Sequence, residues 1–203
     1  MRKTTKFLFA ICTLILLFCF GILIADKQSL RTQFIRLHVV ANSDSTEDQA
    51  EKLAVRDAVM CQLGKHLNGV DDIATARESL KGNIWNINAI ANHTLSELGS
   101  ENIATITFTL EEFNRREYET FSLPAGVYET LRIQIGTGRG RNWWCVVFPE
   151  LCTQTSSENF KATAVSAGIN QGLSLTLSNE PQYEFRFFLL DCIGKIENFL
   201  CFS

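Results

Sequence analysis

The chain has 203 residues, 46% of them apolar, and a formal net charge of −3. This length can bury one substantial hydrophobic core, so a single globular domain is the starting expectation. Apart from Arg2, Lys3 and Lys6, all charged residues follow position 25, where 16 Lys and Arg stand against 22 Asp and Glu, a net charge of about −6. Because binding to nucleic acid requires basic side chains that displace counterions from phosphates, this balance argues against a nucleic-acid partner.

The segment from Phe7 to Ala25 contains no charged residue. As a helix it extends about 28 Å, close to the ~30 Å hydrocarbon core of a bilayer. Basic residues before it and Asp26 after it predict a cytoplasmic N-terminus and an exported remainder. The run is longer than a usual signal core, and Leu23 stands where signal cleavage prefers a small residue, which favours a retained anchor over a cleaved signal. We therefore expect residues 1–25 to be a transmembrane anchor or signal segment and residues 26–203 to form one exported domain.

The first part of the exported domain shows one strand pattern and two helix patterns. Phe34 to Val40 alternates, which predicts a half-buried strand with Arg36 and His38 on its solvent side. Ser45 precedes Asp48 by three residues, the spacing of a helix N-cap, and apolar residues then recur at helical spacing as far as Leu67. A second helical stripe covers residues 73–98, where Gly82 could produce a kink.

The period then changes from 3.6 to 2, which predicts strands. Residues 104–113 alternate most clearly, and further strands are expected at 118–123, 127–135 and 143–148, with a turn at 123–126. After Cys152 the pattern weakens: residues 173–177 alternate, and residues 183–200 combine a strand-like YEFRF with a helical tail. The predicted fold class is α+β, a single exported domain with an antiparallel sheet and packed helices.

The stretch GTGRGRNWWCVVFPELC, residues 136–152, combines glycines, arginines and tryptophans. It lacks the Lys-Ser or Lys-Thr and the following helix of a phosphate-binding loop. A hairpin connection fits better, with Arg139 and Arg141 at its tip, either solvated or in contact with an acidic partner. In the strand that follows, Trp143 and Trp144 point to opposite faces. Either both are buried in a central strand, or one remains exposed as a binding residue.

Cys145 and Cys152 lie on either side of Pro149, which favours a chain reversal between them. An exported protein can form disulfides, and this pairing would stabilise the loop by about 2.5 kcal/mol on the chain-entropy model. We predict this disulfide. Three more cysteines follow the apolar segment, Cys61, Cys192 and Cys201, so at least one thiol is unpaired or bonds between chains.

Catalytic, metal and cofactor signatures are missing from the sequence. Residues 42–48, NSDSTED, place oxygens at alternate positions, but a calcium loop would need glycine at Glu47 and a glutamate at Leu53. Ordinary capping explains this stretch, although His38, Asn42 and Asp44 could form a polar rim. There is no nucleophile elbow or zinc motif. We expect no catalytic residue, no metal and no cofactor.

Three segments together resemble the stage II sporulation protein R family of spore-forming bacteria. They are FIRLHVVANSDSTEDQAEKLAVRDAV at 34–59, LPAGVYETLRIQIGTGRGRNWWCVVFPELC at 123–152, and the hydrophobic segment before both. The sequence departs from the family pattern at Glu150, where a second proline is common. Beyond Cys152 it looks divergent.

The resemblance implies a signal and not an enzyme. Members of this family are made in the forespore and exported toward the space between the forespore and mother-cell membranes. There they activate a membrane-embedded aspartyl-type protease similar to stage II sporulation protein GA, which processes pro-sigma-E in the mother cell. For the partner-binding surface we select His38, Asp44, Arg139, Arg141 and Trp144. The alternative is an extracytoplasmic hydrolase or wall-binding protein in which Trp143 or Trp144 stacks on a sugar.

Overall fold

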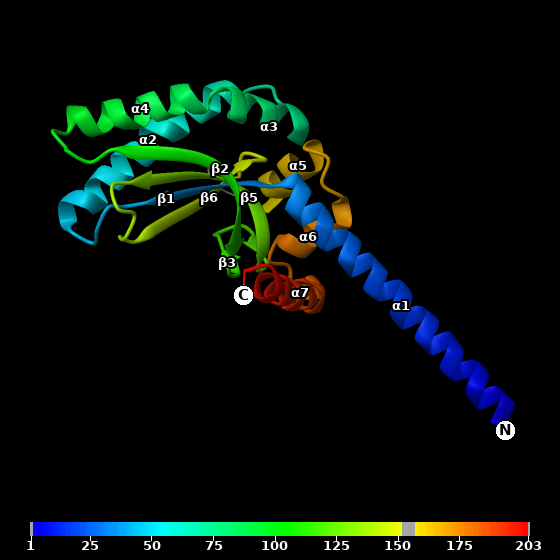
Figure 1. Ribbon diagram of the computed structural model, residues 1–203. Helices are drawn as coiled ribbons and strands as arrows, with labels where there is room; N and C mark the ends of the chain where they lie inside the picture. Colours follow the sequence, from blue (N-terminus) through cyan, green and yellow to red (C-terminus); the bar gives the residue numbers. More distant parts are fainter. Residues whose placement is uncertain (1, 152–156, 203) are drawn as a thin grey trace.

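The computed structural model describes residues 2–151 and 157–202. The protein consists of a sheet with helices on both sides, and one long helix projects from this domain (Figure 1). The helices are α1 (Arg2–Gln33), α2 (Thr46–Leu67), α3 (Ile73–Gly82), α4 (Ile84–Glu97), α5 (Ser157–Ser166), α6 (Gln171–Leu177), the 3₁₀ turn η1 (Pro181–Tyr183) and α7 (Glu184–Phe202). The strands are β1 (Ile35–Val40), β2 (Ala104–Phe113), β3 (Arg116–Glu117), β4 (Ser122–Leu123), β5 (Gly126–Ile135) and β6 (Asn142–Phe148). The predicted α+β class with an N-terminal apolar helix is confirmed.

The main sheet has the strand order β2-β5-β1-β6, and β3 and β4 form a separate small pair. β5 is antiparallel to β2 but parallel to β1, and β1 is antiparallel to β6. Because β1 lies between β5 and β6, the prediction that residues 136–142 form a hairpin turn is wrong. This segment is a crossover that passes the end of β1. β1 is one of the two inner strands and all six of its residues are buried, whereas β6 is an edge strand.

The glycines of the crossover allow it to pack directly on the loop that follows β1. The amides of Arg139 and Gly140 donate to the carbonyls of Asn42 and Ala41, at 3.1 and 2.9 Å. A Cβ on Gly140 would lie 2.1 Å from the carbonyl oxygen of Ser43. The backbones approach so closely that no larger residue fits without displacement.

One face of the sheet is covered along its length by α2, α3 and α4 (Figure 1). Apolar side chains at alternate strand positions, such as Leu37 and Ile133, pack there against Val59 of α2 and Ile87 of α4. The predicted stripe over residues 73–98 is divided in two, because α3 ends at Gly82 and Asn83 has a non-helical φ/ψ of −105° and 7°. The predicted N-cap of α2 is confirmed, since the Ser45 hydroxyl accepts from the Asp48 amide at 3.1 Å.

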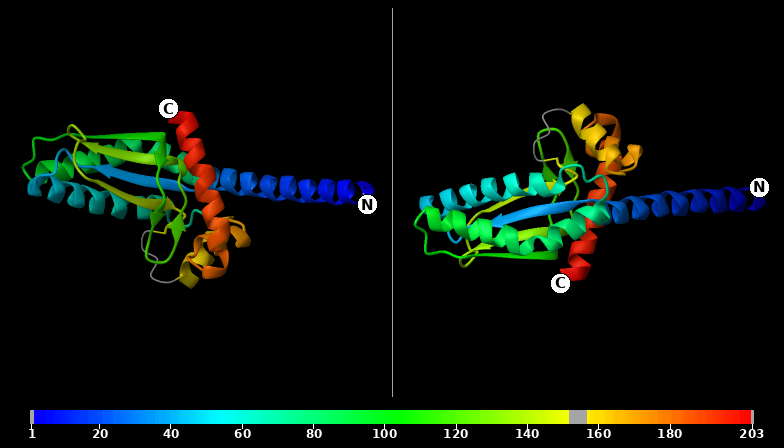
Figure 2. Two further views of the ribbon diagram at one scale, coloured as in Figure 1. Left: turned by 90° about the horizontal axis from the view of Figure 1, so that it is seen from below. Right: turned by 90° about the horizontal axis from the view of Figure 1, so that it is seen from above.

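The opposite face of the sheet is covered only at the end near α1. There the end of α1, the β3–β4 pair and α5 to α7 enclose a second core that includes Phe34, Phe121, Tyr128 and Phe160. The remainder of this face is visible without a covering helix when the molecule is seen from below (Figure 2). Thr105, Thr107 and Thr109 of β2 are exposed there. We call this uncovered half the open face.

Helix α1 is continuous from the apolar segment into the domain (Figure 2). Residues 4–33 form a helix long and apolar enough to cross a bilayer, with a mean hydropathy of 3.0 over an 18-residue window. Burial begins directly after the apolar run: Lys27, Leu30 and Phe34 are buried. The Lys27 ammonium donates to the carbonyl of Ala125 at 2.7 Å. The domain therefore includes the last two turns of the same helix that could span the membrane.

The region after residue 156 is helical where the sequence suggested strands. Residues 173–177 belong to α6, whose N-cap is Asn170; the Asn170 side chain accepts from the Gly172 amide. The YEFRF stretch lies in η1 and α7. Leu173 and Leu177 are both fully buried, and they are four residues apart, so a single helical face satisfies a pattern that also reads as alternation.

Candidate partner-binding surface

A single row of residues crosses the sheet at the edge of the open face. His38 of β1 is paired in register with Arg132 of β5 and with Trp144 of β6, and Arg132 is paired with Thr107 of β2. Residues paired in this way lie side by side on the same face. The His38 and Trp144 rings are stacked, with centroids 5.6 Å apart and planes at 17°.

Glu111 connects two basic side chains in this row. Its Oε2 lies 2.7 Å from Nδ1 of His38, and its Oε1 accepts from Arg132 at 2.8 Å. Burial raises the pKa of the Glu111 carboxyl, but the hydrogen bonds from His38 and Arg132 outweigh it, so that the pKa lies below its ordinary value. The carboxylate is therefore charged at neutral pH and holds the orientation of both partners.

Trp144 also contacts the β3 segment. The Arg116 guanidinium lies 3.6 Å from the centroid of the Trp144 ring, close enough for a strong cation–π contact. Trp144 is half-buried, so part of the indole is accessible. The row Arg116–Trp144–His38–Glu111–Arg132 is thus a continuous chain of aromatic and charged groups, which we call the aromatic–ionic row.

Arg36 precedes His38 by two residues on the same face of β1 and is fully buried. Its guanidinium sits 3.7 Å from the Phe113 ring centroid and donates to the hydroxyl of Tyr118 at 2.9 Å. Among the described residues, its Nε and Nη1 and also Nε2 of His38 have no hydrogen-bond partner. Desolvation lowers the pKa of Arg36. The prediction that the Arg36–His38 side of β1 faces solvent is wrong, because the aromatic side chains of neighbouring segments cover it.

The other predicted residues lie at the end of β1, where the crossover packs. The Asp44 carboxylate accepts from the Arg141 amide at 2.7 Å and lies 3.6 Å from the Arg141 guanidinium. Both side chains are exposed, so this ion pair contributes little to stability. Arg139 is exposed and is held by its backbone on Asn42.

Asn42 and Asp48 fix this end of the molecule. The Asn42 side chain accepts from the Thr137 amide at 2.9 Å and donates to Asp48 at 3.0 Å, and Asp48 also accepts from Asn102 at 3.0 Å. Hydrogen bonds from Ser43, Asn42 and Asn102 lower the pKa of Asp48. The oxygen-rich NSDSTED stretch therefore serves to connect its own loop to the loops that contain Thr137 and Asn102. Among the described residues no group of His, Cys, Asp and Glu could hold a metal ion.

The five predicted residues therefore form two pairs and one separate residue. His38 stacks on Trp144, Asp44 pairs with Arg141, and the Arg139 side chain belongs to neither pair. The sequence reasoning missed Glu111, Arg132 and Arg116. The alternation of β2 places Glu111 on the same face as Thr107 and Thr109, but the strand order that brings it to His38 was not available.

Cys145 is buried and disulfide-bonded. The proposed partner, Cys152, lies outside the described residues, so the Cys145–Cys152 pairing stays a prediction. Cys61 and Cys192 are free thiols.

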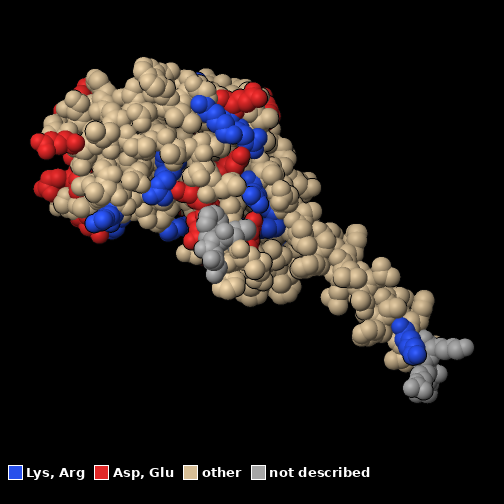
Figure 3. Space-filling model, viewed as in Figure 1, with Lys and Arg blue, Asp and Glu red and all other residues tan. Residues whose placement is uncertain are grey.

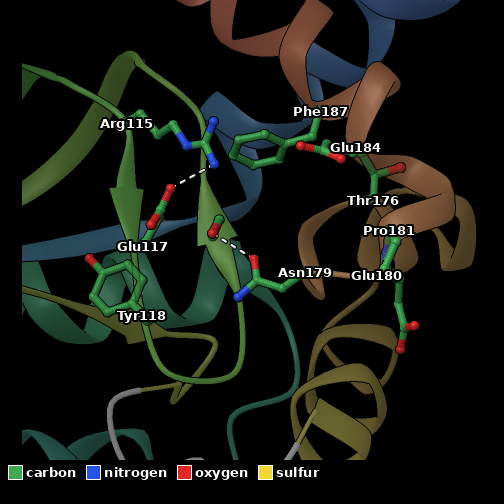
Figure 4. A pocket seen from close by; sticks show the side chains of 10 residues that line it. Arg115, Glu117, Tyr118, Thr176, Asn179, Glu180, Pro181, Glu184 and Phe187 are labelled. Atoms are coloured by element: carbon green, nitrogen blue, oxygen red, sulfur yellow. Dashed lines mark hydrogen bonds and ion pairs between the residues drawn. The ribbon is translucent and has the colours of Figure 1, made fainter.

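A pocket of about 370 Å³ lies between the β3–β4 pair and the segment from α6 to α7 (Figure 4). Several of its polar groups pair with one another or with neighbours. Arg115 binds Glu117 at 2.6 Å, Ser122 donates to Asn179 at 2.6 Å, and Glu180 binds Lys161 at 2.7 Å.

The described residues on the side seen in Figure 3 form no large basic area. On the side seen in Figure 3, basic and acidic side chains are interspersed, and acidic side chains gather at the end where α2 begins. On this side, the distribution suits recognition of a protein more than of a polyanion.

Comparisons with known proteins agree on one family. The family model described as stage II sporulation protein R matches residues 31–158, more than half of the chain. Stage II sporulation protein R of Bacillus subtilis (strain 168) is 38% identical over 120 residues, which cover 59% of this chain and 54% of that protein. No solved structure matches. The matched region runs from the end of α1 through the whole main sheet and includes the aromatic–ionic row. The chain belongs to the stage II sporulation protein R family.

Proposed function

We propose that this protein is an exported signalling protein of sporulation that activates a membrane-embedded aspartyl-type protease similar to stage II sporulation protein GA. The protease would then process pro-sigma-E in the mother cell, while the protein itself is placed in the forespore membrane or in the space between the two membranes. The observation that carries the proposal is the family match over residues 31–158, together with the apolar helix that precedes it.

The surface best suited to the protease is the aromatic–ionic row with the neighbouring crossover. Tryptophan and arginine are enriched among the residues that dominate binding at protein interfaces. Here Trp144, Arg116 and Arg132 lie together at the border of an uncovered sheet face. The exposed Arg139 and Arg141 would add charge to the rim and affect the association rate more than the affinity.

The alternative is a wall-binding protein that stacks a tryptophan on a sugar. Arg116 already occupies a position 3.6 Å from the Trp144 ring, and Arg56 lies 5.1 Å from the ring centroid of Trp143. A sugar would have to displace these guanidinium groups. The contacts of both indoles therefore favour the signalling protein.

A reconstituted processing assay tests the proposal. The full chain is produced in a non-sporulating bacterium together with the protease and pro-sigma-E, and cleavage is followed by immunoblotting. We expect cleavage only when all three proteins are present. Trp144→Ala and Arg116→Ala should reduce cleavage at least tenfold, because they remove the exposed parts of the row.

Trp85→Ala is the matched control, because Trp85 is 79% exposed on α4, on the other side of the sheet. It should leave cleavage unchanged. If the wild-type chain gives no cleavage and is retained on isolated cell wall, the signalling proposal is rejected in favour of the wall-binding protein. Unchanged cleavage by both row variants would move the interface elsewhere.

A further inference from the structure

Helix α7 carries an exposed apolar stripe along its outer side. Its members, spaced by three, eight, three and one residues, share one side of the helix and are each 54–73% exposed: Phe185, Phe188, Ile196, Phe199 and Leu200. Cys192, half-buried, occupies the position between Phe188 and Ile196. Soluble proteins seldom leave a continuous stripe with three phenylalanines in water, so this surface requires a partner.

Three polar residues of α7 point in the opposite direction, into the domain. Asp191 accepts from the amide of Ala125 at 2.8 Å, and Asn198 donates to the carbonyl of Phe113 at 3.0 Å. Glu197 lies 3.4 Å from the ammonium of Lys27. A helix of a soluble domain ordinarily turns its polar side to water and its apolar side to the core. In α7 the outer side is largely apolar as well, and these three polar residues lie on the inner side together with the buried Phe187 and Leu190.

The ion pairs of α7 also fix its level along α1. Arg186 binds Asp26 at 2.6 Å, and Glu197 lies within 4 Å of both Lys27 and Arg31. Asp26 is the first residue after the apolar run that ends at Ala25. At 1.5 Å per residue, these contacts place α7 within about two helical turns of the point where α1 would leave the hydrocarbon.

The direction of α7 suits a membrane surface. In both views of Figure 2, α7 lies across α1 near the point where α1 leaves the domain. In Figure 1, α7 is seen nearly end-on at the lower side of the domain, the side toward which α1 also descends. A helix that lies across a membrane-spanning helix at the level of its exit runs along the bilayer surface.

We propose that α7 is an interfacial helix that lies on the same bilayer that α1 spans, with its apolar stripe immersed among the lipids. Such helices bury their apolar side about 5–10 Å into the boundary between headgroups and acyl chains. Glu184 and Lys195 are the exposed charged residues of α7 among its described side chains, so attraction to anionic lipid is small and apolar burial drives the contact. The proposal depends on α1 remaining in the membrane, and it is independent of the protease.

Photo-crosslinking in vesicles identifies what covers the stripe. The full chain is reconstituted into phosphatidylcholine vesicles with Phe188→benzoylphenylalanine or Phe199→benzoylphenylalanine, illuminated, and analysed by mass spectrometry. We expect adducts with the mass of one phospholipid at both positions. Trp85→benzoylphenylalanine, on an equally exposed aromatic position of α4, should give at least tenfold fewer lipid adducts.

Crosslinks to a second copy of the chain, or no lipid adducts above the Trp85 control, would overturn the proposal. Hydroxyl-radical footprinting of the unaltered chain in the same vesicles gives a second measurement that does not depend on the variants. Phe188 and Phe199 should be protected at least fivefold relative to the unfolded chain, whereas Trp85 should be oxidised nearly as fast as in the unfolded chain. Oxidation of both phenylalanines at the unfolded rate would also contradict an interfacial helix.

Discussion

The imidazole of His38 and the indole of Trp144 stack across neighbouring strands, with ring centroids 5.6 Å apart and planes 17° from parallel. The two residues are direct partners in the register of β1 and β6. Because Glu111 fixes the imidazole from one side and Arg116 lies over the indole, this pair joins the inner strand β1 to an edge strand and to the β3 segment. Its loss should therefore affect both stability and recognition.

Replacing Trp144 should measure the contribution of the stack. Trp144→Ala should lower the free energy of unfolding by about 2 kcal/mol, less than the ~3–5 kcal/mol of a fully buried tryptophan, because Trp144 is half-buried. Trp144→Phe should recover more than half of this loss by retaining a ring. Urea unfolding followed by circular dichroism gives these values, and Trp85→Ala should stay within about 0.5 kcal/mol of the wild type. Equal losses for Trp144→Ala and Trp144→Phe would show that stacking contributes nothing.

Acid should weaken the protein partly through Glu111. Its pKa in the folded state is below the ordinary value of 4.5, so the unfolded chain takes up the proton first as the pH falls. The stability that this carboxylate contributes is present above its unfolded pKa and is lost as the pH decreases through its folded pKa. Glu111→Gln should be less stable than the wild type near neutral pH, and the difference should shrink toward pH ~3. Urea unfolding at both pH values tests this, and a constant difference would contradict it.

The crossover glycine and a helical glycine should respond in opposite directions to the same substitution. Gly140→Ala should lower the free energy of unfolding by about 1–3 kcal/mol, because the new Cβ meets the Ser43 carbonyl, a backbone group that cannot easily move. Gly64→Ala, within α2 and with no atom near the new Cβ, should raise it by about 0.5–1 kcal/mol. Thermal and urea unfolding provide the comparison. Stabilisation by both substitutions would mean that the crossover does not pack on the loop after β1.

Arg36 should be replaceable by an apolar side chain of similar length. Burying a guanidinium without a carboxylate costs several kcal/mol. The cation–π contact with Phe113 stabilises the buried guanidinium by about 2 kcal/mol. The hydrogen bond to Tyr118 stabilises it by about 1.5–3 kcal/mol. Arg36→Met should therefore be as stable as the wild type or more stable. Arg36→Ala should lose about 2–5 kcal/mol through the cavity it leaves. The observation against this account would be that Arg36→Met unfolds as readily as Arg36→Ala in urea.

The sequence predicted the elements whose patterns are local. The alternation of residues 104–113, the Ser45 cap and the apolar N-terminal helix all depend on neighbours within a few residues, and each is confirmed. The helical tail predicted within residues 183–200 is confirmed by α7, but α6 was missed because the spacing of Leu173 and Leu177 satisfies both periods. Only the tertiary contacts of these two leucines in the second core decide between a helix and a strand.

The arrangement of the site could not be predicted in the same way. Insertion of β1 between β5 and β6 joins strands almost 100 residues apart, and no local pattern encodes that choice. The same insertion buries Arg36 and His38, which alternation alone placed in solvent. Glu111 and Arg132 become partners of His38 only through this register.

The unbroken helix α1 has a mechanical consequence. Since its last two turns are held inside the domain by Lys27 and Leu30, there is no joint between bilayer and globule. With α1 retained, the open face keeps a fixed position relative to α1. It diffuses laterally and rotates about the membrane normal with α1, and it tilts only when α1 tilts. If the proposed protease lies in a facing membrane, it would be reached only when the two membranes come within the length of the domain, so the distance between the membranes would decide when contact is made.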